Sequence, residues 1–228
     1  NSKIGSCKFS DLTIFSFHPV KNITTAEGSA ITTNSLQIYR KLLLIRENGQ
    51  DFSGINRVNF PTKYDVTTLG FNFRINEINS SLGLSQIEKT NKFIKKKKLI
   101  AKRYFDELKL PEITLPSKKI LKLSALHLFI IRIDFRKLKI NKFELIKKLK
   151  KKNIVVNCHY IPLNKLKIIK NNLPKINFKN SEKYYEQAMS IPMYPDLKYI
   201  EQSYIISVFK KLIQKYKKKK LNDRLFKI

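Results

Sequence analysis

The chain has 228 residues, of which 42% are hydrophobic, and a formal net charge of +30. This length and apolar content suffice for one or two globular domains with hydrophobic cores. No apolar run approaches the ~20 residues that span a bilayer, so a membrane partner is not expected. The two cysteines, Cys7 and Cys158, form no metal-binding spacing and no disulfide framework, which fits a reducing, cytoplasmic setting.

The strongly basic composition also permits a nucleic-acid-binding protein, because such a surface attracts polyanions. Lysine runs at 95–98, 147–152 and 217–220 lie in segments with helical apolar spacing, which indicates solvated helix faces. The excess is nearly all lysine, whereas specific groove or phosphate recognition usually relies on arginine. No zinc finger, RNP sequence or leucine zipper is found. We therefore expect nonspecific adhesion to polyanions at low salt and no specific nucleic-acid partner.

In chain order, apolar and β-branched residues predict a strand over Leu12–Phe17 and a second over Ala30–Thr33. A helix is predicted over Ser35–Ile45. Residues Asn48–Asp65 mix Gly, Asn, Pro and Ser without periodicity and predict a long loop.

From Asn76, a plausible N-cap residue, apolar positions continue at helical spacing and predict one long helix to about Leu108. We place a domain boundary inside this helix, at about residue 90. The predicted domains are thus 1–90 and 91–228, linked by the helix over about 76–108.

The second half alternates strands and helices, as in a compact α+β domain. Strands are predicted over Leu126–Ile133 and Ile154–Asn157, and helices over Lys142–Lys151 and about 200–216. The first of these helices is expected to bury Phe143, Ile146 and Leu149. The last helix has a broad apolar face, and the tail from Asn222 is expected to fray.

Lys21 is the strongest candidate for a chemical role. It follows the strand that ends near Phe17, beyond Pro19, which cannot donate to a strand ladder. A lysine at a strand end can lie in a partly desolvated cleft, where burial favours the neutral, nucleophilic amine. Such an amine can form a Schiff base with an aldehyde cofactor.

The segment Ser16–Gly28 around Lys21 resembles the active-site lysine segment of the DegT/StrS-type sugar aminotransferases, which use pyridoxal 5'-phosphate. Four further segments resemble later family signatures in the same order: Gly70–Ile78 with Leu82–Gln86, then Ser124–Phe129, His159–Pro162 and Tyr184–Pro195. The resemblance covers most of the chain. It implies an α/β fold, the C-terminal part of a fold-type-I pyridoxal-phosphate transferase, with part of the large cofactor domain in 1–90 and a small α+β domain in 91–228.

The resemblance also implies a reaction and its partners. Family members transfer an amino group, here expected to come from glutamate, to a nucleotide-linked 4-keto-6-deoxy sugar for cell-surface polysaccharide synthesis. Lysine at position 21, where sugar dehydratases of the family have histidine, favours transamination. The family resemblance further implies a homodimer in which two chains complete each site.

Individual roles follow from the matched motifs. Lys21 is the expected catalytic residue, and Ser16 and Asn72 are expected to bind the cofactor phosphate, Asn72 that of the neighbouring subunit. The expected substrate-side residues are His18, Arg74, His159 and Tyr160. Simpler explanations stay open, since Asn72 is also a common turn residue and Arg74 also fits an exposed ion pair.

A second interpretation, in which the chain is not catalytic, rests on two departures from the family pattern and on an expected truncation. Ser29 stands where the family usually has a second glycine, and a β-carbon there would strain a turn that needs positive φ. Asn48-Gly49 stands where related chains often have His-Gly. The family lysine lies near mid-chain, so Lys21 indicates an N-terminally truncated chain that lacks the residue pairing with the pyridine nitrogen. A non-catalytic fragment of the same fold therefore stays possible.

Overall fold

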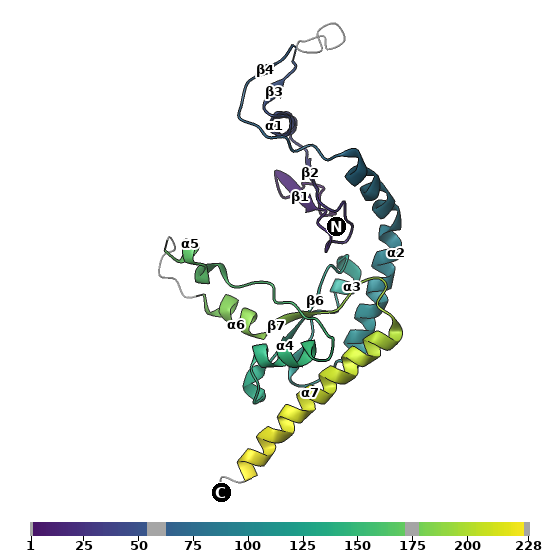
Figure 1. The fold of residues 1–228 in the computed structure, drawn as a ribbon, viewed down its shortest axis with the longest axis vertical. Coiled ribbons are helices and arrows are strands. Elements are labelled where there is room, and N and C mark those ends of the chain that lie inside the picture. The colour runs from purple at the N-terminus through teal and green to yellow at the C-terminus, as the bar shows by residue number, and fades with distance from the viewer. Residues whose placement is uncertain (1, 54–62, 172–177, 226–228) are drawn as a thin grey trace. The chain divides into compact units, whose positions relative to one another are not determined.

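The computed structural model describes residues 2–53, 63–171 and 178–225, with side chains described as far as Lys217. The chain divides into two compact units, Asn1–Thr90 and Asn91–Ile228, which share one long helix (Figure 1). None of the described helices is long and apolar enough to cross a membrane.

The first unit begins with an antiparallel hairpin. Strand β1 (Leu12–Ser16) pairs with β2 (Ser29–Thr33), and Ile14 lies opposite Ile31. Helix α1 (Leu36–Arg46) follows, and the Ser35 hydroxyl caps it by accepting a hydrogen bond from Ile38 N at 3.3 Å. The two predicted strands and the predicted helix are confirmed.

A second hairpin interrupts the predicted loop. Strands β3 (Gln50–Asp51) and β4 (Asp65–Val66) pair, so the loop prediction for 48–65 is wrong at these residues; 54–62 lie outside the described part. The backbone at Asn48-Gly49 passes very close to the backbone at Thr68 and Gly70, and this close approach positions the hairpin. A β-carbon on Gly49, whose φ is 75°, would lie 1.8 Å from Thr68 O, and one on Gly70 would lie 2.1 Å from Gly49 N. Only glycine permits this approach.

Helix α2 (Glu77–Glu107) confirms the predicted long helix. The Asn76 side chain accepts a hydrogen bond from Asn79 N at 2.8 Å, as expected of an N-cap residue.

The second unit contains an antiparallel sheet in the order β5 (Ile113–Thr114), β6 (Phe129–Ile133) and β7 (Ala188–Ile191). The central strand β6 is completely buried at Phe129, Ile131 and Ile133. The described residues of this unit also form six short helical segments and the C-terminal helix: α3 (Ile120–Leu123), η1 (Phe135–Lys137), α4 (Lys142–Lys150), η2 (Leu163–Lys165), α5 (Lys167–Lys170), α6 (Lys179–Gln187) and α7 (Tyr199–Leu225).

Several predictions for this unit are corrected. Strand β6 begins three residues late, because Leu126 has a φ of 54°, and His127 therefore precedes the strand. The predicted strand 154–157 is reduced to a single bridge between Asn157 and Ser190. The aromatic residues Tyr184 and Tyr194 are 39% and 47% exposed and lie outside the hydrophobic core.

The helix faces also differ from expectation. In α4 the buried residues are Lys142, Leu145 and Leu149, whereas Phe143 is 60% exposed. The buried face carries Leu145 and Leu149, both completely buried, and on the same face the Lys142 ammonium donates to Tyr185 O. In α7, whose apolar face was predicted, Ile205, Phe209 and Ile213 are buried, whereas Ile200 is 74% exposed.

Candidate active site

The loop after β1 presents Lys21 on a tight turn. Lys21 N donates to His18 O at 2.9 Å, with Pro19 in the second position that turns favour. Phe17 closes the loop from both sides, because its N–H donates to Gly28 O at 2.9 Å and its carbonyl accepts from Thr25 N at 3.0 Å. Lys21 is therefore held near the tip of a closed loop at a strand end.

Ser16, His18 and Lys21 lie together on this turn, and all three are exposed. His18 N donates to Ser16 Oγ at 3.4 Å, and Val20 N donates to His18 Nδ1 at 3.5 Å. The described residues leave the Lys21 side chain exposed, so they do not by themselves provide the desolvated cleft that a reactive lysine can occupy. The ammonium also has no carboxylate partner among the described residues.

A buried threonine, which the sequence reasoning missed, anchors the loop to helix α2. Thr25 is 3% exposed, and its Oγ1 donates to Glu27 O at 2.8 Å. Asn79 Nδ2 donates to the same carbonyl at 3.2 Å. A β-carbon on Gly83 would lie 2.7 Å from Thr25 Cγ2, so the helix passes Thr25 only because position 83 is glycine. The signal in the sequence was a glycine inside a helical pattern, which often marks close packing.

The expected strain at Ser29 is absent. Ser29 is the first residue of β2 and lies opposite Ser16 in the hairpin register. The positive φ values of the turn belong to Ala26, at 62°, and to Gly28, at 155°, where a β-carbon would meet Thr25 Oγ1 at 2.4 Å. This departure from the family pattern therefore does not distort the loop that carries Lys21.

Asn72 and Arg74 lie beside the end of α1. Asn72 bridges Glu47 through the backbone, and the Arg74 guanidinium forms an ion pair with the Glu47 carboxylate. The hydrogen bond from Arg74, followed by its charge and the contact with Arg46, holds the pKa of Glu47 below its usual range. Both Asn72 and Arg74 are exposed, so the ion-pair explanation for Arg74 is the one the structure shows.

His159 and Tyr160 belong to the second unit. His159 is half-buried, and its Nδ1 lies 3.3 Å from Ser190 Oγ. The two rings meet edge to face, with centroids 4.8 Å apart, and Tyr160 is 76% exposed. The predicted site residues thus form three groups: the Lys21 turn and the Asn72–Arg74 segment in the first unit, and this ring pair in the second.

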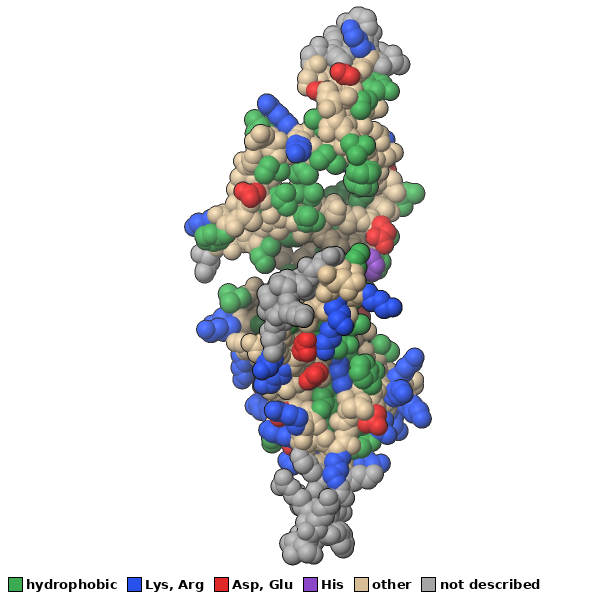
Figure 2. Space-filling view, turned by 90° about the vertical axis from the view of Figure 1, so that its left-hand side faces the viewer, with side chains coloured by type: hydrophobic (Ala, Val, Ile, Leu, Met, Phe, Trp, Pro, Cys, Tyr) green, Lys and Arg blue, Asp and Glu red, His purple; other side chains and the backbone are tan. Residues whose placement is uncertain are grey.

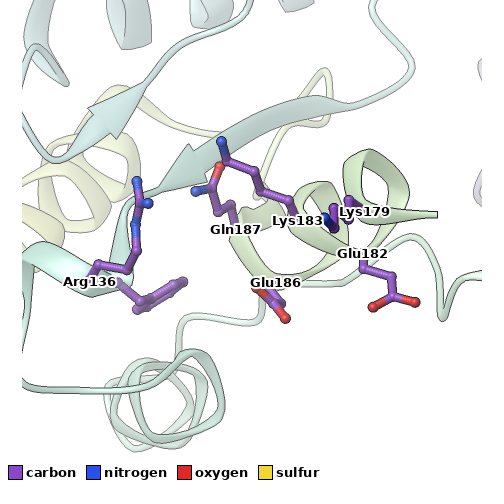
Figure 3. A pocket seen from close by; sticks show the side chains of 7 residues that line it. Arg136, Lys179, Glu182, Lys183, Glu186 and Gln187 are labelled. Atoms are coloured by element: carbon purple, nitrogen blue, oxygen red, sulfur yellow. The ribbon is translucent and has the colours of Figure 1, made fainter. Parts of the chain in front are cut away.

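Two surface cavities of the second unit contain none of these residues. A groove of about 390 Å³ lies between η1 and α6, and Figure 3 shows Arg136, Lys183 and Gln187 with their polar ends on one side and Glu182 and Glu186 on the other. This mixed charge does not favour an anion. A more apolar groove of about 670 Å³ is lined mainly by residues 153–157 and the start of α7.

Residues 2–210 match the DegT/DnrJ/EryC1/StrS aminotransferase family. The chain belongs to this family. The match includes the Lys21 loop, the Asn72–Arg74 segment and the His159–Tyr160 pair, and it confirms the resemblance seen in the motifs.

Members of the DegT/DnrJ/EryC1/StrS family with solved structures or assigned names are similar over nearly the whole chain. A UDP-4-amino-4,6-dideoxy-N-acetyl-β-L-altrosamine transaminase of Campylobacter jejuni is 30% identical over 219 residues, covering 96% of this chain and 56% of that protein. The structure of Helicobacter pylori PseC, an aminotransferase of pseudaminic acid biosynthesis, is 28% identical with a TM-score of 0.81, covering 91% and 54%.

A putative sugar aminotransferase, Spr1654 of Streptococcus pneumoniae, in its PLP-form, is also 28% identical with a TM-score of 0.77, covering 92% of this chain and 54% of its own. These structures confirm the predicted α/β fold class. The chain spans about half the length of the curated relatives it matches.

Proposed function

We propose that this chain carries the reactive lysine of a pyridoxal-phosphate aminotransferase that transfers an amino group to a nucleotide-linked 4-keto-6-deoxy sugar. The observation that carries the proposal is Lys21 on its closed, strand-end turn, with an ammonium that no described carboxylate occupies. Family membership supports it, and so do the relatives named for this sugar chemistry and for a PLP-form.

The residues of the turn fit the cofactor chemically. A primary amine is the group that bonds to an aldehyde carbon, and a hydroxyl is a suitable donor to a phosphate oxygen. Because Ser16 Oγ already accepts from His18 N, its own proton remains to be donated. When bound, pyridoxal 5'-phosphate supplies an electron sink that acidifies the substrate carbon.

Lys21 then has two tasks in our proposal. Its Nζ would hold the cofactor by its aldehyde group, and as a free amine it would take up and pass on the proton of the substrate carbon. Glutamate is proposed as the amino donor. His18, His159 and Tyr160 are proposed to contact the sugar nucleotide, and Arg74 would have to leave Glu47 to bind an anionic group.

We further propose a homodimer, with Asn72 reaching the cofactor phosphate of the neighbouring subunit. The exposure of Asn72 and of its neighbours Phe71 and Phe73, which stack at 4.9 Å and are 50% and 66% exposed, supports this proposal. Exposed aromatic pairs of this kind are common at protein interfaces.

The test is chemical labelling of the chain with pyridoxal 5'-phosphate, reduction with borohydride, and peptide mass spectrometry. Because the chain has 39 lysines, the position of the adduct matters more than its amount. We expect a dominant pyridoxyl adduct on Lys21, absent in Lys21→Ala and unchanged in Lys41→Ala, a surface control from α1. Scattered labelling that is the same in all three proteins would contradict the proposal and favour a non-catalytic member of the fold.

A further inference from the structure

Ser190 touches His159, one of the proposed substrate-side residues, from a rigid position. It lies in β7, is 6% exposed, and forms a reciprocal backbone pair with Asn157, with N···O distances of 2.8 and 3.1 Å. Its hydroxyl lies 3.2 Å from Asn157 O and 3.3 Å from His159 Nδ1. The hydroxyl therefore bridges a backbone carbonyl and an imidazole nitrogen.

The direction of this bridge is fixed by proton count. A hydroxyl has a single proton, and a carbonyl oxygen can only accept. Both contacts of the hydroxyl are satisfied at once only when Ser190 O–H donates to Asn157 O, whose other lone pair accepts Ser190 N–H at 2.8 Å. The hydroxyl oxygen then accepts from the ring, which requires the proton of a neutral imidazole to be on Nδ1.

We propose that Ser190 is a positioning residue that holds His159 in the Nδ1–H tautomer, so that Nε2 accepts a hydrogen bond from a hydroxyl or amide N–H of the sugar. The ligand part of this proposal rests on the function proposed above. Nε2 has no hydrogen-bond partner among the described residues, and the ring is half-buried. A neutral Nε2 acceptor would be repelled by a phosphate oxygen, so the geometry selects the sugar over the diphosphate.

The tautomer can be read by long-range ¹H–¹⁵N correlation on the chain labelled with ¹⁵N-histidine, at a pH of about 8.5, where imidazoles are neutral. The chain has three histidines, and His159→Gln identifies the signals of His159. We expect a protonated-type Nδ1 and an acceptor-type Nε2. The opposite pattern in the unmodified chain would overturn the proposal without any variant.

Three variants separate positioning from general destabilisation. Ser190→Ala is expected to shift both nitrogen signals toward a mixture of tautomers, and Ser190→Thr, which retains the hydroxyl, is expected to restore them. Ser207→Ala removes a hydroxyl that donates to Tyr204 O in α7 and should leave His159 unchanged. Identical His159 signals in Ser190→Ala and the unmodified chain would contradict the role of Ser190.

The ligand part has its own readout. Addition of UDP-N-acetylglucosamine is expected to shift the Nε2 signal, whereas UDP alone is expected to leave it in place. An equal shift with both, or none with either, would overturn the assignment of a sugar donor. The tautomer of His159 is measured without cofactor or sugar. The role of Ser190 would therefore still be supported if pyridoxal 5'-phosphate failed to label Lys21.

Discussion

The two units of the chain differ in how they are stabilised. Every buried hydrophobic side chain of the described residues lies at or beyond Ile100, so the described part of the first unit buries no hydrophobic side chain. Residues 1–90 contain 10 Lys and Arg against 7 Asp and Glu, which leaves 37 against 10 for residues 91–228. Figure 2 shows these cations crowded over the second unit.

This difference in hydrophobic burial and charge affects how the Lys21 loop is stabilised. The second unit has a hydrophobic core large enough to support its own fold despite strong self-repulsion. The first unit carries Lys21 and is held by backbone hydrogen bonds and close glycine contacts, with apolar residues such as Ile14 and Ile31 exposed. An isolated two-stranded hairpin is only marginally stable, so the Lys21 loop is the part that depends on further contacts.

The largest expected effect is on stability, when an isoleucine is replaced by alanine in a strand of the second unit and, for comparison, in a strand of the first. Ile131→Ala, in the fully buried centre of β6, should lower the free energy of unfolding by about 2–5 kcal/mol, because it leaves a cavity. Ile14→Ala, at a 64% exposed position of β1, should cost less than about 1 kcal/mol, the value of a cross-strand pair. Urea denaturation measures both, and equal losses would remove the distinction between the units.

A buried carboxylate provides the next test. Glu112 is 4% exposed and pairs with Lys217 of α7 at 2.9 Å. Lys217→Ala would leave this carboxylate without its cation and should cost about 1–3 kcal/mol. Lys215→Ala, which removes an equal charge from an exposed position of the same helix, should change stability by less than about 0.5 kcal/mol. Similar losses in both variants would show that net charge, not the pair, matters.

Sequence reasoning succeeded where local rules are decisive. Asn76 caps the helix that it was expected to cap, the helix predicted from Ser35 begins there, and the strand before Lys21 ends ahead of Pro19 as predicted. It failed where tertiary contacts decide. Helical periodicity predicted that Phe143 is buried, whereas the packed face of α4 carries Leu145, Leu149 and the contact of Lys142 with Tyr185 O.

The candidate site shows the same limit. The sequence motifs identified Lys21, Ser16 and the other candidates. No local pattern, however, identified Thr25 as the residue that packs against Gly83, 58 positions later in the sequence. The exposure of Lys21 likewise depends on which segments cover it, and that is a property of long-range packing. The expected desolvation followed from the usual environment of a reactive lysine and not from its neighbours in sequence.

A rescue experiment tests whether glycine contacts hold the Lys21 loop. Gly83→Ala adds a β-carbon 2.7 Å from Thr25 Cγ2 and should cost about 1–3 kcal/mol locally through overpacking. Thr25→Ser removes that methyl and retains the hydroxyl that donates to Glu27 O. In this background Gly83→Ala should become neutral or stabilising by up to about 1 kcal/mol, the helix preference for alanine.

Hydrogen exchange of the amides at Thr25 and Glu27, which donate within this loop, is the measurement. Faster exchange in Gly83→Ala and recovery in the double variant are expected. Loss of protection that Thr25→Ser does not repair would show that the loop is anchored elsewhere.

The smallest effect concerns the segment that carries Asn72 and Arg74. The Glu47 carboxylate, 24% exposed, has a lowered pKa because Arg74 donates to it. A carboxylate with a lowered pKa stabilises the folded state above its unfolded pKa of about 4.3 and loses this contribution as the pH falls. Arg74→Gln should therefore raise the pKa of Glu47 and cost less than about 1 kcal/mol at neutral pH, the usual value of an exposed pair.

Carboxyl ¹³C titration of Glu47 checks this shift, with Arg40→Gln in α1 as the control that removes an exposed arginine outside the pair. An unchanged midpoint in Arg74→Gln would mean that Arg46, the second cation beside Glu47, suffices to hold the carboxylate. In that case Arg74 could leave Glu47 for an anionic ligand at almost no cost. A clear shift would instead make the ion pair a competitor that any ligand of Arg74 must displace.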